Sequence, residues 1–529
     1  GQGMSNPGAS SDFVTPAPKA AFSRAFWMLN TIEMFERLAF YTLRVMAPIY
    51  IMQADDPGGL HLTAKDKGII YSWWAVFQSI LPIATGGFAD RYGYKRTLTF
   101  AISMMTVGYL LVALLRDIVW LPPTELMSAL DRSNFWTLFL SIMVLATGTA
   151  FFKPSIQGSL ANVLTKENSS IGWGLFYWVV NVGAFVGHFL PAWFLADKHT
   201  PEAWRNLFLC SAGFMALNFL ILPTFHDVAT GGVKTDSLGR VLWNTVVNIL
   251  NPRLLVWLAI MSGFWMMMYQ LWDLQPNFIS DWVDSSPMAE GLRWLPKKMF
   301  NALTDETSRG YMIPQNVLLS INAFCIILGV LGMAWLTRRM RTLTAMLGGM
   351  LLATTGVLVA GLTMSPWMLA LGIMCFSLGE MTTGPKKSEY LGLIAPPGKK
   401  GLYLGYVNIP VGVGIFLGSW LAGIVYGRFG EKATLALRYI LEKTPKGQGL
   451  TWDQDIASLP KLLGIERPDA MTKLQELSGL DATAATKLLW ETYDPQYYVW
   501  LPFAAIGAVS AIALAIFGQR AKRWSDMNA

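Results

Sequence analysis

The sequence is poor in charged residues. Only 14% of the 529 residues are charged, whereas 53% are hydrophobic, and the mean hydropathy is +0.39. Soluble domains are about one quarter charged. The composition therefore predicts a polytopic membrane protein, whose lipid-facing surfaces cannot carry many charges.

Cysteine and histidine are also scarce. The three cysteines, Cys210, Cys325 and Cys375, each fall within an apolar stretch, which predicts no disulfide. The four histidines are scattered, and the sequence contains neither an H-E-x-x-H pair nor a G-x-S-x-G elbow. We therefore expect a protein that is not an enzyme and that holds no metal and no cofactor.

Apolar stretches long enough for a ~30 Å hydrocarbon core recur from end to end. They predict an all-α protein with about twelve transmembrane helices, at 24–52, 68–90, 97–115, 135–163, 173–196, 205–224, 253–280, 312–336, 341–363, 366–395, 400–428 and 496–519. The first stretch lacks the short apolar core and small residues of a cleavable signal, so it is expected to remain as the first span.

Basic residues in the short loops predict the orientation. Under this count one side of the membrane receives Arg91, Lys95, Arg96, Arg338, Arg339, Arg341, Lys399, Lys400, Arg520, Lys522 and Arg523. Because basic loops stay inside, this side and both termini are predicted to be cytoplasmic, in a bacterial type of inner membrane. The net charge of +7 is then a topology signal, and no nucleic-acid partner is expected.

The order of the spans predicts two six-helix bundles joined by a linker. The expected parts are an N-terminal tail (1–23), a first bundle (24–224), a cytoplasmic linker with an amphipathic helix (225–252), helices seven to eleven (253–428), an extracytoplasmic insertion (430–495), a last span (496–519) and a tail (520–529). The insertion contains a helix after a predicted Asp481 cap. It is either a solvated addition or a lid over the substrate entrance.

Charges within the first span are the strongest functional signal. In EMFERLAFYTLR, Glu33, Glu36, Arg37 and Arg44 fall on one stripe of the helix together with Phe40 and Tyr41. A lone charge at the bilayer centre costs ~3 kcal/mol or more. Four charges on one face therefore indicate a water-filled cavity and mutual pairing, the alternative being a purely architectural salt bridge.

Two halves around a central site are typical of the major facilitator fold. Residues 86–96, GGFADRYGYKR, resemble the loop signature of that superfamily, with Asp90 as the acidic member. Glycines at this place allow a tight turn between closely packed helices. The alternative is a basic loop with a chance aspartate.

Further strings resemble the proton-coupled oligopeptide transporter family. They are EMFERLAFY in the first span, GTAFFKP with Lys153, FYWVVNVGA with Asn181, FWMMMYQ, SINAF with Asn322, and GEMTTGP with Glu380. The sequence departs from the family pattern at Leu38, Phe40, Ser155 and Gly384, and Tyr269 stands where the family usually has an acidic residue. The insertion has no counterpart in this resemblance.

The resemblance implies import of di- and tripeptides driven by protons, by a monomer with no partner beyond peptide and lipid. Residues matching Arg37, Arg44 and Lys153, with Tyr41, hold the peptide carboxylate in the family. Those matching Glu380, Asn181 and Asn322 receive the amino terminus. A zwitterion needs both poles, which the two halves supply.

Coupling requires carboxyl groups that compete with the peptide for a cation. Glu33 and Glu36 lie beside Arg37, and Glu380 is expected to pair with Lys153 in the empty carrier. Because Tyr269 replaces the family acid, Asp273 one turn further is a candidate partner of Arg44 at the outer gate. The alternative is a gate closed by packing, with Tyr269 stacked on Arg44 and Asp273 solvated at the helix end.

Two other classes of protein remain as alternatives. A channel could also use buried charge, but opposite poles on two halves favour a carrier. Relatives of this family also carry nitrate or larger metabolites, so a proton-coupled carrier of a non-peptide anion is the second hypothesis. Glu380 discriminates between peptide transport and anion transport, because a carrier of a plain anion has little use for a carboxylate in its substrate site.

Overall fold

A computed structural model describes residues 21–86, 88–118, 127–165, 167–196, 199–229, 237–396 and 400–524. Most of the predicted N-terminal tail, part of the linker (230–236), the basic loop residue Lys399 and the end of the C-terminal tail (525–529) lie outside these ranges. The side chain of Asp90 also lies outside the described part.

The first half is a bundle of helices, several of them interrupted within one predicted span. Its elements are α1 (Arg24–Arg44), α2 (Ala47–Met52), α3 (Ala64–Ala75), the π-helical η1 (Val76–Ile80), α4 (Leu81–Thr85), α5 (Phe88–Tyr92), α6 (Tyr94–Ala113), α7 (Leu115–Ile118), α8 (Met127–Val163), α9 (Ser169–Phe189), α10 (Pro191–Leu195), α11 (Pro201–Ile221) and η2 (Leu222–Thr224). The linker contributes α12 (Leu238–Ile249).

The second half repeats this plan and adds extramembrane elements. Its spanning elements are α13 (Pro252–Met268), η3 (Tyr269–Leu271), α14 (Leu274–Trp282), α17 (Gln315–Thr337), α18 (Thr342–Gly361), α19 (Pro366–Ile394), α20 (Lys400–Gly405), α21 (Asn408–Val425), η4 (Tyr426–Gly430) and α26 (Pro495–Ala521). Between α14 and α17 lie α15 (Ser286–Glu290), α16 (Lys297–Leu303) and an antiparallel hairpin of β2 (Asp305–Thr307) and β3 (Gly310–Met312).

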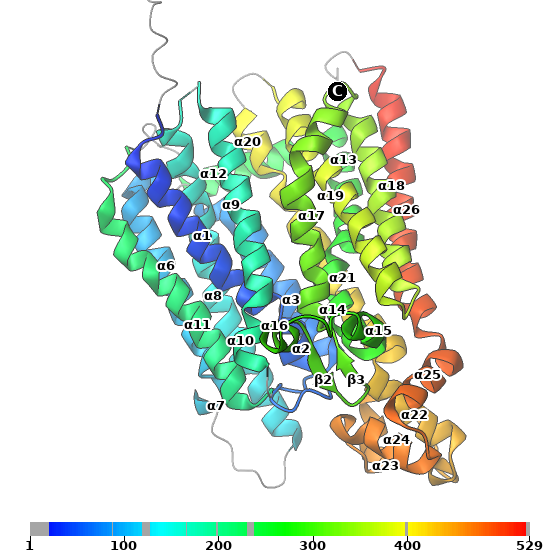
Figure 1. Cartoon of the computed structure of the whole chain (residues 1–529). Helices are drawn as coiled ribbons and strands as arrows, with labels where there is room; N and C mark the ends of the chain where they lie inside the picture. Colours follow the sequence, from blue (N-terminus) through cyan, green and yellow to red (C-terminus); the bar gives the residue numbers. More distant parts are fainter. Residues whose placement is uncertain are drawn as a thin grey trace, which may run out of the picture.

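The two bundles lie side by side, with the first and the last described residues at one end of the molecule (Figure 1). We call this the termini end. The opposite end, called the insertion end, holds α2, α14, the hairpin and α22–α25. This arrangement confirms the predicted all-α, two-bundle architecture; the short hairpin was not predicted.

Nine helices in the described part of the chain are long and apolar enough to cross a membrane. The predicted spans at 24–52, 68–90 and 366–395 fall outside this set, although they are helical in the structure. The first and the last of them carry the predicted site charges Glu33, Glu36, Arg37 and Glu380. The first and the last of these spans therefore depart from a purely apolar composition, because they carry the charged residues of the predicted site.

Glycines bring the two halves together between α3 and α21. A Cβ atom on Gly68 would lie 2.6 Å from the Ser419 carbonyl oxygen, and one on Gly423 would lie 2.7 Å from the Ala64 carbonyl oxygen. Only residues without a side chain permit such an approach of two backbones. The Ser72 hydroxyl donates to the Phe416 carbonyl in the same interface, at 2.7 Å.

The insertion is a small helical subdomain. It contains α22 (Lys432–Lys443), the 3₁₀ turns η5 (Pro445–Gly447) and η6 (Ile456–Ser458), α23 (Leu459–Leu463), the 3₁₀ turn η7 (Arg467–Asp469), α24 (Ala470–Ser478) and α25 (Ala482–Tyr493). The Asp481 side chain accepts from the Ala484 amide at 2.8 Å, which confirms the predicted cap. Leucines of α22, α24 and α25 form its core.

Arg467 fastens the insertion to the first half. Its guanidinium donates to the carbonyls of Met52, His61 and Leu62 at 3.0, 3.0 and 3.2 Å. It also forms an ion pair with Glu431 at 2.6 Å. Because Met52 and Leu62 belong to the first half and Glu431 to the second, Arg467 connects the two bundles at the insertion end. The insertion is therefore more than a solvated addition.

Replacing Arg467 is expected to loosen the insertion end. In a variant whose native cysteines are replaced and Ala54 is changed to Cys, Arg467→Gln should speed maleimide labelling at position 54 at least about threefold, since hydrogen bonds to a charged group contribute about 1.5–3 kcal/mol. Arg428→Gln is the matched control, because Arg428 hydrogen-bonds only to Gln454, within its own half. Equal labelling rates in both variants would show that the Arg467 contacts do not hold the end closed.

Candidate functional site

The charged stripe of α1 forms one buried cluster. The Arg37 guanidinium donates to both oxygens of Glu36, with Nε to Oε2 at 2.5 Å and Nη2 to Oε1 at 2.6 Å. Glu33 lies 3.6 Å from Arg37 Nε, and its second oxygen is buried without a hydrogen-bond partner in the described structure. The cluster thus holds two carboxylates and one guanidinium, and Glu33 is the less engaged carboxylate.

Two glycines of α9 allow α1 to approach. A Cβ atom on Gly183 would lie 2.8 Å from Arg37 Cβ, and one on Gly187 would lie 2.8 Å from Tyr41 Cβ. The spacing of four residues in both helices matches one turn, so the two contacts stack along the interface. This gives a physical reason for the glycine in the string FYWVVNVGA, and it fixes Arg37 and Tyr41 in position.

Lys153 and Asn181 complete the first half of the site. Lys153, from α8, is within electrostatic range of Glu33, Glu36 and Arg37. Asn181, from α9, donates to the carbonyl of Tyr177 at 2.9 Å. Both lie on helices that pack against α1, so the structure brings these predicted residues together with the charged stripe.

The second half contributes Glu380 from α19. The Asn322 amide of α17 donates to Glu380 Oε2 and to the Ser377 hydroxyl, both at 2.9 Å. Tyr41 and Tyr177 of the first half are within electrostatic range of Glu380. A carboxylate on one half therefore faces tyrosine side chains on the other.

The expected pair of Lys153 and Glu380 is not formed. In the described residues no ion pair joins them. Glu380 instead has Lys387, seven residues further along α19, as its charged neighbour. Lys387 was not singled out in the sequence, because a lysine near the end of a span is usually a snorkelling residue.

The helix carrying Tyr269 breaks where the sequence predicted a continuous span. After α13 the chain forms the 3₁₀ turn η3, and α14 begins at Leu274. Asp273 lies in this break and is fully buried, at 0% exposure, so it is not a solvated residue at a helix end. Its carboxylate pairs with Lys67 of α3 at 2.8 Å.

Arg44 is enclosed by aromatic rings and, among the residues that the structure describes, forms an ion pair with no carboxylate. Its guanidinium carbon lies 4.0, 4.2 and 5.1 Å from the ring centroids of Trp74, Tyr71 and Tyr269. Asp273 acts on it only at longer range. Both gate hypotheses thus describe part of the arrangement: Tyr269 stacks on Arg44, while Asp273 serves a different cation, Lys67.

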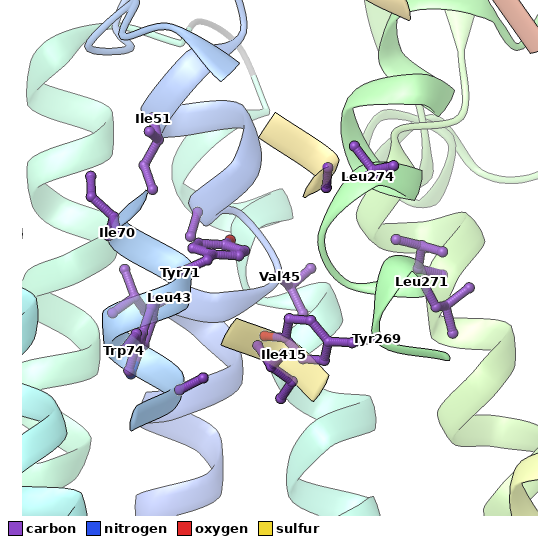
Figure 2. Close-up of a cluster of buried hydrophobic side chains, with 14 of the residues drawn as sticks. Leu43, Val45, Ile51, Ile70, Tyr71, Trp74, Tyr269, Leu271, Leu274 and Ile415 are labelled. Atoms are coloured by element: carbon purple, nitrogen blue, oxygen red, sulfur yellow. The ribbon is translucent and has the colours of Figure 1, made fainter. Parts of the chain in front are cut away.

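Buried apolar side chains of both halves lie in the same region as Tyr71, Trp74 and Tyr269 (Figure 2). Leu43, Val45, Ile51 and Ile70 approach from the first half, and Leu271, Leu274 and Ile415 from the second. All of these side chains are buried. This region of the interface thus combines a buried apolar cluster from both halves with one buried ion pair, that of Lys67 and Asp273.

A chain of polar groups continues from Lys67 toward the insertion end. Lys67 donates to Asn277 at 2.9 Å, the Asn277 amide donates to Gln53 at 3.0 Å, and Gln53 donates to Asp281 at 2.7 Å. The Tyr426 hydroxyl donates to the other oxygen of Asp281 at 2.5 Å. From Lys67 to Asp281 successive members alternate between the halves, and Tyr426 belongs to the second half, so this chain of hydrogen bonds connects the two halves.

His199 adds a connection outside the spanning segments. Its Nδ1 lies 2.6 Å from Asp56 of its own half and its Nε2 lies 3.6 Å from Asp305 of the hairpin. Burial lowers the pKa of His199, but hydrogen bonds and charges from Asp305 and Asp56 outweigh burial and raise the pKa to about 10. The imidazole is therefore cationic at neutral pH, and this ion pair is lost only as the pH rises toward 10.

Known proteins with similar sequences and structures are transporters. The Major Facilitator Superfamily matches residues 29–285. Dipeptide and tripeptide permease A of Chromobacterium violaceum is 22% identical over 246 residues, which are 45% of this chain and 42% of the permease. The match thus spans about two fifths of that relative's length.

Solved structures show the same fold. A peptide transporter POT in complex with sulfate has a TM-score of 0.61 at 15% identity, covering 94% of both chains. The nucleoside transporter NupG has a TM-score of 0.63 at 12% identity, covering 93% of this chain and 100% of its own.

The two bundles have the major facilitator fold, and residues 29–285 match the model of that superfamily. Peptide permeases and peptide transporters are among the proteins that the chain is similar to, in keeping with the resemblance of its motifs.

The pair of Lys67 and Asp273 can be tested by a double-mutant cycle. Lys67→Met or Asp273→Leu alone leaves one buried charge unpaired, which should destabilise the protein by about 3–5 kcal/mol, whereas the double variant should recover most of the loss. Unfolding in detergent and labelling of a cysteine at position 54 report stability and closure. Lys65→Met is the control, since Lys65 is exposed. Additive losses in the double variant would mean that the two side chains do not act as a pair.

Proposed function

We propose that the protein imports di- and tripeptides together with protons by alternating access. The observation that carries the proposal is the separation of charge between the halves: Arg37 and Lys153 lie in the first half, and Glu380 with Asn322 lies in the second. A zwitterionic peptide between them satisfies both poles, and it draws the halves together because each pole belongs to a different half.

The orientation follows the basic loops. We infer that the termini end faces the cytoplasm and the insertion end faces outward, in an inner membrane of the bacterial type, with protons as the coupling ion and no bound cofactor. The connections between the halves at the insertion end then correspond to a closed outer gate. The site opens inward in this state, which is consistent with the unformed pair of Lys153 and Glu380. We expect the working unit to be a monomer.

The cluster on α1 supports a coupling mechanism. Glu36 binds Arg37 through two hydrogen bonds and Glu33 lies nearby with one unpaired oxygen. A proton on Glu33 weakens the hold of the carboxylates on Arg37, so the guanidinium becomes available to a peptide carboxylate. Deprotonation on the cytoplasmic side restores the cluster and expels the carboxylate, which links the proton to peptide release.

Glu380→Gln tests the peptide assignment. In reconstituted vesicles with an imposed pH gradient, uptake of dialanine should fall at least about tenfold, a loss of about 1.4 kcal/mol or more in binding the ammonium. Glu389→Gln on the exposed side of the same helix is the control. Monodispersity in detergent verifies folding. A folded Glu380→Gln protein with parental dialanine uptake would refute the peptide assignment and favour a plain anion as substrate.

Glu33→Gln and Glu36→Gln test the coupling. Each variant should lose uptake driven by the pH gradient more strongly than counterflow, the exchange of peptide between equal pools, because exchange completes no net proton cycle. We expect a reduction of driven uptake by about tenfold or more, with counterflow within about threefold of the parent. Parallel losses in both assays would argue that the carboxylates are architectural.

A further inference from the structure

Lys387 is a buried cation that the proposed transport cycle does not use. It lies in α19, is 6% exposed, and its ammonium stands 4.2 Å from the ring centroid of Trp265 in α13. In the described part of the chain it makes no ion pair or hydrogen bond. Among the described residues, Glu380 and Lys387 are the charged groups that act on each other in electrostatic range. The second half thus holds one isolated pair of opposite charges.

The surface between these two charges is open. At about 100° per residue, Glu380, Gly384 and Lys387 share one face of α19, and seven residues rise about 10 Å. A Cβ atom on Gly384 would meet nothing within 4 Å, whereas one on Gly379, on another face of the helix, would lie 2.4 Å from the Gly349 carbonyl oxygen. Gly384 therefore leaves space beside the helix between a carboxylate and an ammonium.

The charge balance of this half changes when a peptide binds. In the empty site the negative charge of Glu380 offsets the positive charge of Lys387. Once the peptide ammonium occupies Glu380, Lys387 retains only the face of Trp265, and an unmatched cation in a low-dielectric interior is costly. The peptide's own carboxylate cannot restore the balance, because the proposed function assigns it to the cations of the first half.

We propose that Lys387 and the space over Gly384 form a subsite for an acidic peptide side chain, so that the carrier prefers di- and tripeptides bearing Asp or Glu. A side-chain carboxylate at this place pairs with Lys387 while the peptide ammonium pairs with Glu380, and every charge then has a partner. A basic side chain would meet Lys387 as a like charge and is disfavoured. This inference rests on the proposed peptide transport and specifies its substrates.

Competition against labelled dialanine tests the subsite. In counterflow at pH 7, Ala-Glu should inhibit about tenfold more strongly than Ala-Gln, a factor that corresponds to about 1.4 kcal/mol. Ala-Lys should inhibit least. Ala-Gln matches Ala-Glu in size, so the ratio of the two isolates the charge of the side chain.

Two variants assign the preference to Lys387. Lys387→Gln should bring the ratio of inhibition by Ala-Glu to inhibition by Ala-Gln to about one, measured in the counterflow that the variant retains. Lys386→Gln is the matched control, because the neighbouring Lys386 already pairs with Glu389 at 3.1 Å, and it should keep the preference. Gly384→Leu, which fills the open space, should weaken Ala-Glu more than dialanine.

The outcomes separate this inference from the proposed function. Dialanine exchange with equal inhibition by Ala-Glu and Ala-Gln in the parent overturns the acidic subsite and leaves peptide transport intact. If Lys387→Gln still prefers Ala-Glu to Ala-Gln, the preference comes from the cations of the first half. This result also overturns the inference. A folded parent protein that exchanges no peptide overturns both.

Discussion

A charge inside a membrane has to be paired with an opposite charge. The charged pairs of this protein lie in three separate regions of the molecule. Glu36 matches Arg37 within one helix, Asp273 matches Lys67 across the halves, and Glu380 is left with the more distant Lys387. The first match is tight, the second closes a gate, and the third is loose enough for a ligand to replace. In the proposed transport cycle the cluster that contains the first pair takes up the proton, the second pair holds the halves together at the insertion end, and Glu380 of the third receives the peptide ammonium.

The closed end shows how a gate can be strong and still reversible. Apolar side chains from both halves exclude water around Arg44 and Tyr269, which strengthens the single buried ion pair next to them. Further out, the groups from Asn277 to Asp281 exchange hydrogen bonds of modest net value, because each can bond to water after separation. Opening is thus expensive only at the innermost layer, where the buried pair of Lys67 and Asp273 has to be separated.

Much of this structure could be predicted from the sequence. Helix lengths, the two-half layout, the charged stripe of α1 and the Asp481 cap follow from periodicity and local chemistry. The break at Tyr269–Leu271 could not be predicted, because an apolar run has the same composition whether or not its hydrogen bonding changes to a 3₁₀ turn. Lys67 and Lys387 were missed for a related reason. A lysine near the end of a span has the same sequence signature whether it reaches the headgroups or turns inward, and only tertiary packing decides between the two.

The contacts of Arg467 have a consequence for the evolution of the outer surface. All its partners in the first half are backbone carbonyls, at Met52, His61 and Leu62, so the identity of those side chains does not affect the bond. Mutations of side chains in this loop then do not affect the hydrogen bonds to Arg467, as long as the backbone keeps its path. Residue covariation across homologues should couple Arg467 to Glu431 and to nothing in the first half. The contact between Arg467 and the first half would therefore produce no covariation signal in a sequence alignment. The insertion and the loop are then free to diverge independently.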